Sequence, residues 1–212
     1  MVRTAQERAI DCLLTTYVID DAFSRCELQS MPETMLQKLV FLSERSMIRE
    51  RKKGFCFRFV KLKYGPFSQE LKDSLGGLKK TGLVGSRLAP TPPLGVLLQD
   101  FRDVIERNKI FFQEISQVND AYAGMSLREL LNTVYAMPWG KHGKTIKDLP
   151  LRTPMLYPMR PGNVKLEFGI TAEEGEDLLM NFDLEAITQL QQAASDMREG
   201  RTRTYEQVFA GL

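Results

Sequence analysis

The sequence predicts an α+β protein that is mostly α-helical, with a small antiparallel sheet and a small α/β module at the C-terminal end. Three observations lead to this fold class. Apolar residues recur at intervals of three and four over most of the chain, as on one face of an α-helix. Strand-forming residues are concentrated in 55–64 and prolines in 138–162. With 212 residues and 43% hydrophobic content, the chain can bury a substantial core.

Two helices are expected in the first 53 residues. The first has an apolar stripe with helical spacing, formed by Ile10, Leu13, Leu14, Tyr17 and Val18. The second is expected to begin at Ser30, because Ser30 and Glu33 have the spacing of a capping box and Pro32 is tolerated in a first turn. Its apolar face consists of Leu36, Leu39, Val40 and Met47. It is expected to end in the basic run 49–53, before Gly54.

The segment 55–64 predicts a strand, with Phe55, Phe57 and Phe59 on one side. The break at Gly65 and Pro66 is interpreted as a corner between this strand and a helix, in preference to a catalytic loop. Ser68 is well placed to cap that helix, whose buried face would contain Leu71, Leu75 and Leu78.

The rest of the chain is expected to divide at a proline-rich linker. Residues 82–98 read as a short strand or turn and an irregular connection, and one long helix should carry Phe101 to Val118. Capping boxes at Ser126 and Thr171 predict two further helix starts. The expected domains are 1–137, helical with a small sheet, a linker at 138–162, and an acidic strand–helix module at 163–212. In that module, a strand over Val164–Phe168 precedes helices starting near Thr171, Asp183 and Thr204.

Reactive centres are hard to assemble from this sequence. The single histidine, His142, lies in the proline-rich linker, and the three cysteines are far apart, so neither a zinc site nor a catalytic pair with histidine is expected. No glycine-rich phosphate-binding motif is present. The carboxylates between Glu173 and Asp177 suit the first turns of a helix. The prediction is therefore a protein that is not an enzyme and uses no metal or cofactor. An enzyme whose active site is assembled from residues that no sequence motif connects is kept as an alternative.

The cellular setting follows from the cysteines and the apolar runs. Cys12, Cys26 and Cys56 form neither an even set nor a CxxC pair, which is typical of buried thiols in a reduced, cytoplasmic protein. No apolar run reaches the roughly 18 residues that span a bilayer, so no membrane partner is expected. Charged residues near the start, among them Arg3, Glu7 and Arg8, interrupt the apolar core that a signal peptide needs.

Charge is distributed unevenly along the chain. Residues 45–87 contain 12 Lys/Arg against 3 Asp/Glu, whereas residues 163–200 contain 2 against 9. The order of helix, basic strand, helix and hairpin-like segment resembles a winged-helix domain. The candidate binding residues are Arg49, Arg51, Lys52, Lys53, Arg58, Lys61 and Lys63. They are expected to contact duplex DNA, an acidic protein partner or the chain's own acidic end, or to form only a solvated surface.

Several segments resemble the Panacea, or SocA-like, domain family. They are LQKLVFLSE (36–44), KYGPFS (63–68) and LKKTGLV (78–84), and SLRELLNTVYAMPW (126–139) is similar to the family's last helix. The resemblance covers roughly residues 5–140. It implies a helical domain with a small sheet, found as the antitoxin of toxin–antitoxin systems and in phage-associated genes. Family members neutralise unrelated toxins by direct binding, and one delivers its toxin to a protease.

The resemblance implies no catalytic residue. It gives Tyr64, Gly65 and Pro66 a structural role at a turn: proline fixes φ, glycine permits the turn, and the tyrosine ring packs beneath it. The segment 182–209 also resembles the C-terminal portions of small antitoxins.

The predicted function is that of a non-enzymatic antitoxin-like protein, which neutralises a partner toxin by covering its active site with an apolar patch and a charged rim. The alternative is a winged-helix-like DNA-binding transcriptional regulator that controls its own operon. The identity of the toxin, homo-oligomerisation, and packing of the acidic module on the basic region are left open.

Overall fold

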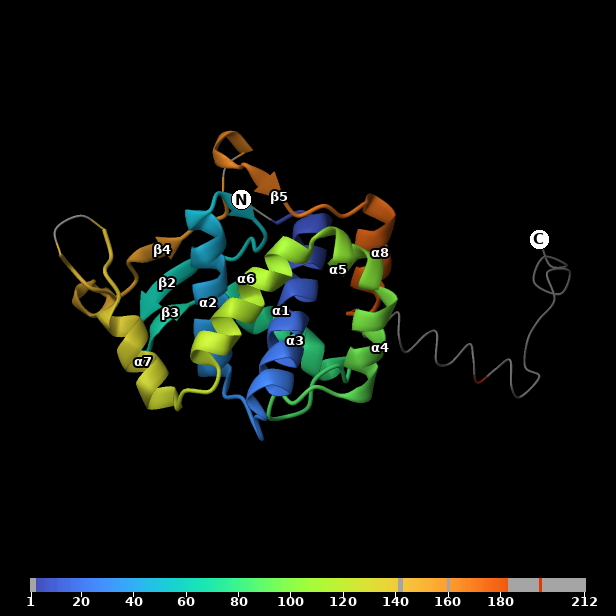
Figure 1. Cartoon of the computed structure of the whole chain (residues 1–212), viewed down its shortest axis with the longest axis horizontal. Coiled ribbons are helices and arrows are strands. Elements are labelled where there is room, and N and C mark those ends of the chain that lie inside the picture. Colours follow the sequence, from blue (N-terminus) through green and yellow to red (C-terminus); the bar gives the residue numbers. More distant parts are fainter. Residues whose placement is uncertain (1–2, 141–142, 160, 183–194, 196–212) are drawn as a thin grey trace, which may run out of the picture.

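The described residues, 3–140, 143–159, 161–182 and 195, form eight α-helices and five short strands in a computed structural model (Figure 1). The helices are α1 (Ala5–Cys26), α2 (Glu33–Arg49), α3 (Gln69–Lys80), α4 (Pro92–Asp100), α5 (Arg102–Arg107), α6 (Lys109–Tyr122), α7 (Leu127–Ala136) and α8 (Ala172–Met180). The strands are β1 (Lys52–Lys53), β2 (Phe59–Leu62), β3 (Gly65–Phe67), β4 (Pro154–Leu156) and β5 (Leu166–Glu167). Two 3-10 turns are η1 (Ile146–Asp148) and η2 (Pro161–Asn163). The predicted class, α+β and mostly helical with a small antiparallel sheet, is confirmed.

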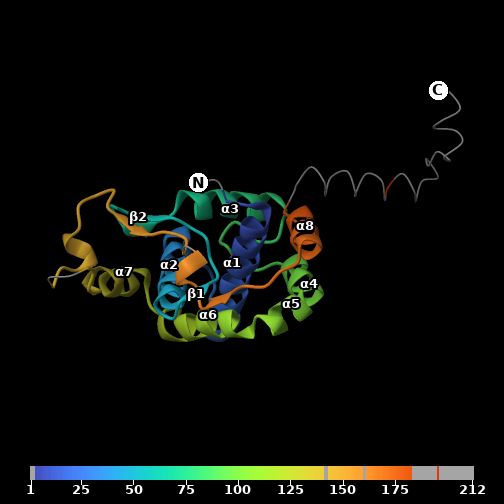
Figure 2. The ribbon, with the colours of Figure 1, turned by 90° about the horizontal axis from the view of Figure 1, so that it is seen from above.

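The core is built around α1 and α2. α6 covers one side of this pair, and α3 and the β2–β3 hairpin lie on the other (Figures 1 and 2). The apolar stripe predicted for the first helix is buried except for Tyr17, which is half-buried with its ring edge-on to Phe112 at 4.7 Å between centroids. Phe41 of α2 contacts Phe59 of β2 in the same edge-on way at 5.4 Å, which joins the helices to the sheet.

The predicted strand-to-helix corner at Gly65 and Pro66 is wrong, because both residues belong to a second strand. β2 pairs antiparallel with β3, and the pairing of Leu62 with Gly65 leaves Lys63 and Tyr64 as a two-residue turn. Gly65 has φ of +85°, which an L side chain rarely adopts. Pro66 is tolerated because β3 is an edge strand.

The proline-rich segment 138–162 supplies part of the sheet. β4 pairs antiparallel with the other edge of β2, so the sheet has the order β3–β2–β4. η1 packs against α7, and Trp139 lies 5.9 Å from the ring of Phe41. A segment with little periodicity in its sequence therefore folds against the helical core.

The acidic segment packs on the basic region. β5 pairs parallel with β1, where Lys53 aligns with Glu167, and α8 packs against α1. Phe168 is buried with its ring centroid 5.3 Å from that of Phe111, and Leu178 is also buried. This answers the open question for residues 163–182. The helices expected near Asp183 and Thr204 lie outside the described residues, and the domain boundaries at 137 and 163 stay predictions.

Most of the predicted helix starts are confirmed. Ser126 and Thr171 form complete capping boxes, and Ser68 accepts a hydrogen bond from the Leu71 amide. The box predicted at Ser30 is wrong. Pro32 is the N-cap of α2, and the Glu33 carboxylate pairs instead with Lys79 of α3.

Two other helix predictions are wrong. The irregular connection expected before residue 98 contains α4, which begins with proline at the position where a helix tolerates it. The single long helix expected after Phe101 is broken at Asn108 into α5 and α6. The Asn108 side chain donates to the carbonyls of Val104 and Gly169 and accepts from the Gly169 amide, each at 2.8 Å. Those bonds hold the C-terminal segment at the break.

Candidate functional site

Five of the seven predicted basic residues are engaged inside the chain. Their partners are the Asn163 carbonyl for Arg51, Glu114 for Lys52, Glu167 and Glu7 for Lys53, Glu70 for Arg58, and the Lys147 and Leu149 carbonyls for Lys61. Arg49 and Lys63 are exposed and make no ion pair with a described residue. The seven residues therefore do not form one open cationic surface.

The turn of the β2–β3 hairpin carries an exposed aromatic side chain. Tyr64 is 57% exposed, and the ammonium of Lys63 lies 5.5 Å from the centre of its ring. The expected packing of this ring beneath the turn is wrong, because other side chains occupy that space. A Cβ at Gly65 would lie 3.6 Å from Lys38 and 3.8 Å from Tyr135.

Three polar side chains hold the hairpin in place. The Gln37 amide donates to the Ser68 carbonyl at 2.9 Å and accepts from the Ser68 amide at 2.8 Å. The Lys38 ammonium donates to the Pro66 carbonyl at 2.6 Å, and the Tyr135 hydroxyl donates to the Lys63 carbonyl at 2.5 Å. Backbone groups in the turn, in β3 and directly after β3 are thus fixed from α2 and α7.

Lys38 is an unusual residue for this role. Lys38 is only 2% exposed, and burial lowers the pKa of its ammonium to about 8. The described residues offer it a backbone carbonyl and no carboxylate. Burying this amine costs free energy of folding, and its hydrogen bond to the Pro66 carbonyl stabilises the position of the hairpin.

Two hollows flank the turn. The smaller has a volume of about 280 Å³ and is lined by Glu33, Thr34, Gln37, Lys38, Leu62, Lys63, Tyr64, Gly65, Phe67 and Lys72. The larger, of about 760 Å³, is lined by Lys61, Leu62, Lys63, Asn132, Tyr135, Ala136, Thr145, Lys147 and Leu151. We call Lys63, Tyr64 and these two hollows the hairpin-tip face.

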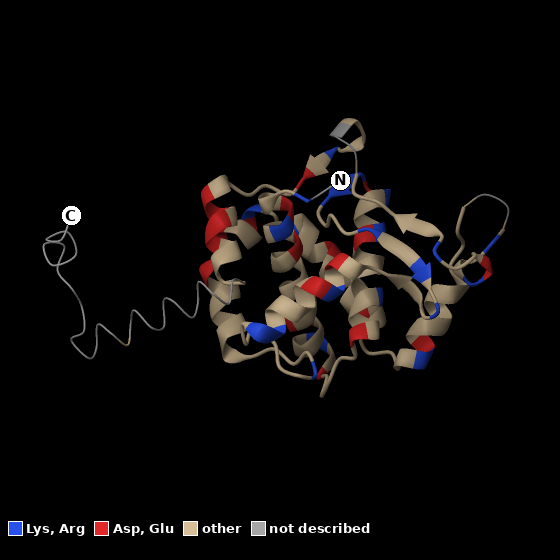
Figure 3. Ribbon diagram, turned by 180° about the vertical axis from the view of Figure 1, so that it is seen from behind, with Lys and Arg blue, Asp and Glu red and all other residues tan. Residues whose placement is uncertain are grey.

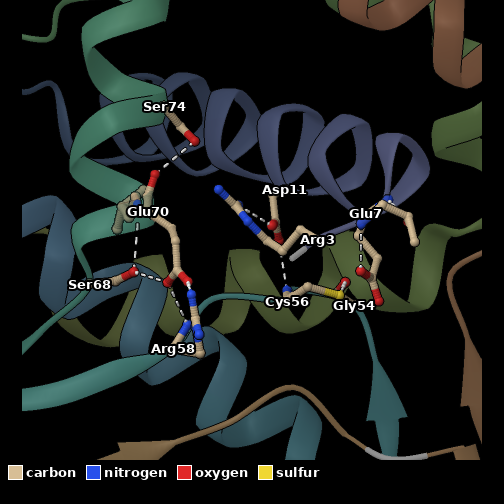
Figure 4. Close-up of polar contacts among 11 residues, drawn as sticks. Arg3, Glu7, Asp11, Gly54, Cys56, Arg58, Ser68, Glu70 and Ser74 are labelled. Atoms are coloured by element: carbon tan, nitrogen blue, oxygen red, sulfur yellow. Dashed lines mark hydrogen bonds and ion pairs between the residues drawn. The ribbon is translucent and has the colours of Figure 1, made fainter. Parts of the chain in front are cut away.

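A second polar cluster lies inside the molecule, between α1, α3 and the segment after β1 (Figure 4). The Asp11 carboxylate is buried, with the Arg3 guanidinium at 2.6 Å and the Cys56 amide at 2.7 Å. Burial raises the pKa of Asp11 to about 7, against the opposing effects of these two donors. Glu44 on α2 is also buried, and neither of its carboxyl oxygens has a hydrogen-bond partner in the described structure. Burial raises its pKa well above the ordinary value.

This internal cluster is poorly suited to chemistry. Burial raises the pKa of Cys12 to about 12 and also raises that of Cys56, so both thiols stay protonated at neutral pH and are weak nucleophiles. Within the described ranges, no group of three or more His, Cys, Asp or Glu side chains is placed to hold a metal ion. The hairpin-tip face, which solvent reaches, is the better candidate for function.

No protein-family model, curated protein or solved structure matches this chain. The resemblance to the Panacea family therefore stays a prediction. None of the helices in the described part of the chain has the length and apolar character needed to cross a membrane.

Sequence reasoning missed the residues that support the face: Gln37, Lys38 and Tyr135. One local signal was available, because Lys38 has Met35, Phe41 and Leu42 at helical spacing and so lies on an apolar side of α2. The partner of such a lysine cannot be read from the helix, since Pro66 is 28 residues away.

Proposed function

We propose that this chain is a non-enzymatic, antitoxin-like protein of the cytoplasm. It binds a partner toxin through the hairpin-tip face and inhibits it by covering the toxin's active site. The observation that carries the proposal is an exposed tyrosine, Tyr64, on a turn that is fixed on both sides and flanked by two hollows.

Tyr64 has the properties of an interface anchor. Tyrosine is enriched among residues that dominate binding energy, because a large ring and a hydroxyl are presented at low conformational cost. The hydrogen bonds to the Lys63 and Pro66 carbonyls fix the backbone around Tyr64 before a partner binds. The conformational entropy lost by this turn on binding is therefore small. Side chains of the partner can enter the hollows on either side of the ring.

The resemblance to the Panacea family is the reason for proposing a toxin as the partner. Contacts between the segments that carry this resemblance support the choice of the hairpin as the binding region. Gln37 and Lys38, from the first matching segment, contact the second segment at Pro66 and Ser68. Tyr135, from the last matching segment, contacts it at Lys63. Three of the four matching segments thus meet at the hairpin. The free thiols of Cys12, Cys26 and Cys56 suit a reducing compartment and support the cytoplasmic part of the proposal.

The DNA-binding alternative receives less support. Binding to DNA depends on free Lys and Arg side chains that neutralise phosphates and so release the counterions of the DNA. Lys52, Lys53 and Arg58 are already paired with carboxylates of the chain. Arg51 and Lys61 are bonded to backbone carbonyls.

Co-expression tests the proposal. The full chain is expressed with each product of the adjacent genes, and growth rescue and co-purification are measured. We expect one toxic product to be captured and its toxicity relieved. Tyr64→Ala should weaken capture by about tenfold or more, which corresponds to a loss of about 1.4 kcal/mol or more on truncation of an anchor residue.

Tyr157→Ala is the matched control. Tyr157 is 60% exposed and follows β4, which is aligned with the end of β2 away from the turn. This variant should capture the partner as the wild type does. Equal loss in the two tyrosine variants, or the absence of any captured toxic product, would overturn the proposal.

A further inference from the structure

We propose that the larger hollow of the hairpin-tip face binds an acidic, partly apolar segment of the protein partner. Carboxylates of that segment would contact Lys61, Lys63 and Lys147, and an apolar side chain would rest on Leu151. The inference depends on the proposed function and specifies the chemistry of the partner.

Among the described residues, three lysines and no carboxylate line the hollow. Lys63 and Lys147 are exposed, and neither forms an ion pair with a described residue. The adjacent carboxylate, Asp148, is occupied at the start of η1, where it accepts from the Thr145 amide at 2.9 Å and the Thr145 hydroxyl at 2.8 Å. These hydrogen bonds lower the pKa of Asp148, and the charges of Lys147 and Lys61 add to the effect. The lysines therefore make the hollow electropositive, which favours binding of an anionic group.

Lys61 provides the most desolvated charge. It is a buried residue whose ammonium donates to the Lys147 carbonyl at 2.7 Å and to the Leu149 carbonyl. An ammonium has three donors, so one remains for a ligand. Lys61 forms no ion pair with a described carboxylate, and a partner carboxylate could accept a charge-assisted hydrogen bond from its remaining donor.

The lining favours a peptide over a nucleic acid. Leu62, Ala136 and Leu151 contribute apolar surface, and Leu151 is 65% exposed. None of the described residues that line the hollow is an arginine, and the three lysines are gathered in one concavity instead of following an extended phosphate backbone. A mixed apolar and cationic lining matches a segment in which leucine-like and acidic side chains alternate.

The chain's own α8 is an unsuitable occupant. Glu173, Glu176 and Asp177 are exposed along this helix, but α8 lies at the opposite end of the molecule from the hairpin (Figures 1 and 3). Among the described residues, α8 is therefore not the source of an acidic ligand for the hollow, and the proposal assigns that ligand to the protein partner.

Fluorescence anisotropy with defined probes tests the inference on the full chain. The probes are a labelled 12-residue peptide of alternating Glu and Leu, the same peptide with Gln in place of Glu, and a 12-base-pair duplex DNA. We expect the Glu peptide to bind and the Gln peptide to bind about tenfold more weakly, and the affinity for the Glu peptide to fall between 50 and 200 mM salt.

Charge-reversal variants locate the binding. Lys147→Glu and Lys63→Glu should each weaken the Glu peptide by about tenfold. Lys109→Glu is the matched control, because Lys109 is an exposed lysine at the start of α6 and makes no ion pair with a described residue. It should bind the peptide as the wild type does, and circular dichroism checks that every variant is folded.

Four results with the purified chain would overturn the inference: no binding of the Glu peptide, equal weakening by Lys109→Glu, tighter binding of the duplex that is lost in Lys147→Glu, or self-association that is lost in Lys147→Glu. The last two would assign the hollow to a nucleic acid or to a second copy of this chain.

A fifth result comes from toxin capture. If Tyr64→Ala abolishes capture of the toxin while Lys147→Glu and Lys63→Glu leave it unchanged, the inference fails and the proposed function stands. If the Glu peptide binds as expected but no toxin is captured, the hollow is confirmed and the antitoxin proposal fails.

Discussion

Replacing Asp11 by asparagine is expected to remove a large pH-dependent loss of stability. Burial raises the pKa of Asp11 from its ordinary value of 3.8 to about 7 in the folded protein. Below pH 3.8 both the folded and the unfolded states hold the proton. As the pH rises towards 7, the unfolded chain loses this proton while the folded protein keeps it, so unfolding becomes progressively more favourable. Above pH 7 the loss is complete.

The magnitude follows from the two pKa values. Each pH unit between them costs about 1.4 kcal/mol, so the free energy of unfolding falls by about 4 kcal/mol over the whole interval and by about 3 kcal/mol between pH 5 and 7. Asparagine has no proton to lose, and its oxygen can still accept from the Cys56 amide. Arg3 loses its ion pair but keeps its position 5.2 Å from the centre of the Phe57 ring.

Urea denaturation followed by circular dichroism at several pH values measures this difference. The free energy of unfolding of the wild type should fall relative to Asp11→Asn by about 3 kcal/mol from pH 5 to 7. Asp100→Asn, an exposed acid at the end of α4, is the control and should stay within about 0.5 kcal/mol of the wild type throughout. Parallel curves for Asp11→Asn and the wild type would refute the assignment of a raised pKa to Asp11.

Three other substitutions test the fold. Glu44→Gln should gain stability relative to the wild type as the pH rises from 5 to 8, because burial raises the pKa of Glu44; denaturation curves that differ by a constant amount would contradict this. Gln37→Ala should cost about 2–4 kcal/mol in urea denaturation, because the buried Ser68 amide and carbonyl lose their partners; a loss below about 1 kcal/mol would contradict the contacts described. Gly54→Ala should cost about 1–3 kcal/mol, seen as a fall in Tm of about 2–12 °C, because its Cβ would lie 2.6 Å from the Met47 sulfur and 3.1 Å from the Phe111 ring; Gly95→Ala, where nothing lies within 4 Å, is the control.

Local signals predicted the parts of the fold that depend on neighbours in sequence. The capping boxes at Ser126 and Thr171 and the cap at Ser68 are satisfied within three or four residues, so the sequence alone indicates them. The box at Ser30 failed because Glu33 has a better partner in Lys79, which is 46 residues away. A competing long-range contact cannot be seen in a local pattern.

The hairpin and its support show the same limit. Lys63 and Tyr64 lack the Asn-Gly or Asp-Gly signature of a two-residue turn, so the sequence favoured a corner. The segment 82–98 was predicted to end in an irregular connection, although Pro92 and Pro93 occupy the first turn of α4, where a helix tolerates proline. The basic residues were predicted to bind a partner, but the availability of Lys52, Lys53 and Arg58 depends on Glu114, Glu167 and Glu70, whose positions only the tertiary structure reveals.

The segment from β5 to α8, which packs on α1 and α6, is synthesised last among the described elements, and this order has a consequence during translation. Phe168 and Leu178 complete a core whose other side is α1 and α6, and α6 ends at Tyr122. At translation rates of about 5–20 residues per second, the chain between Tyr122 and Leu178 takes roughly 3–11 s to make. During that interval the nascent protein exposes the apolar flank of its first helix. A chaperone that recognises apolar surface would therefore bind this protein most readily in that interval, before α8 packs against α1 and buries this surface.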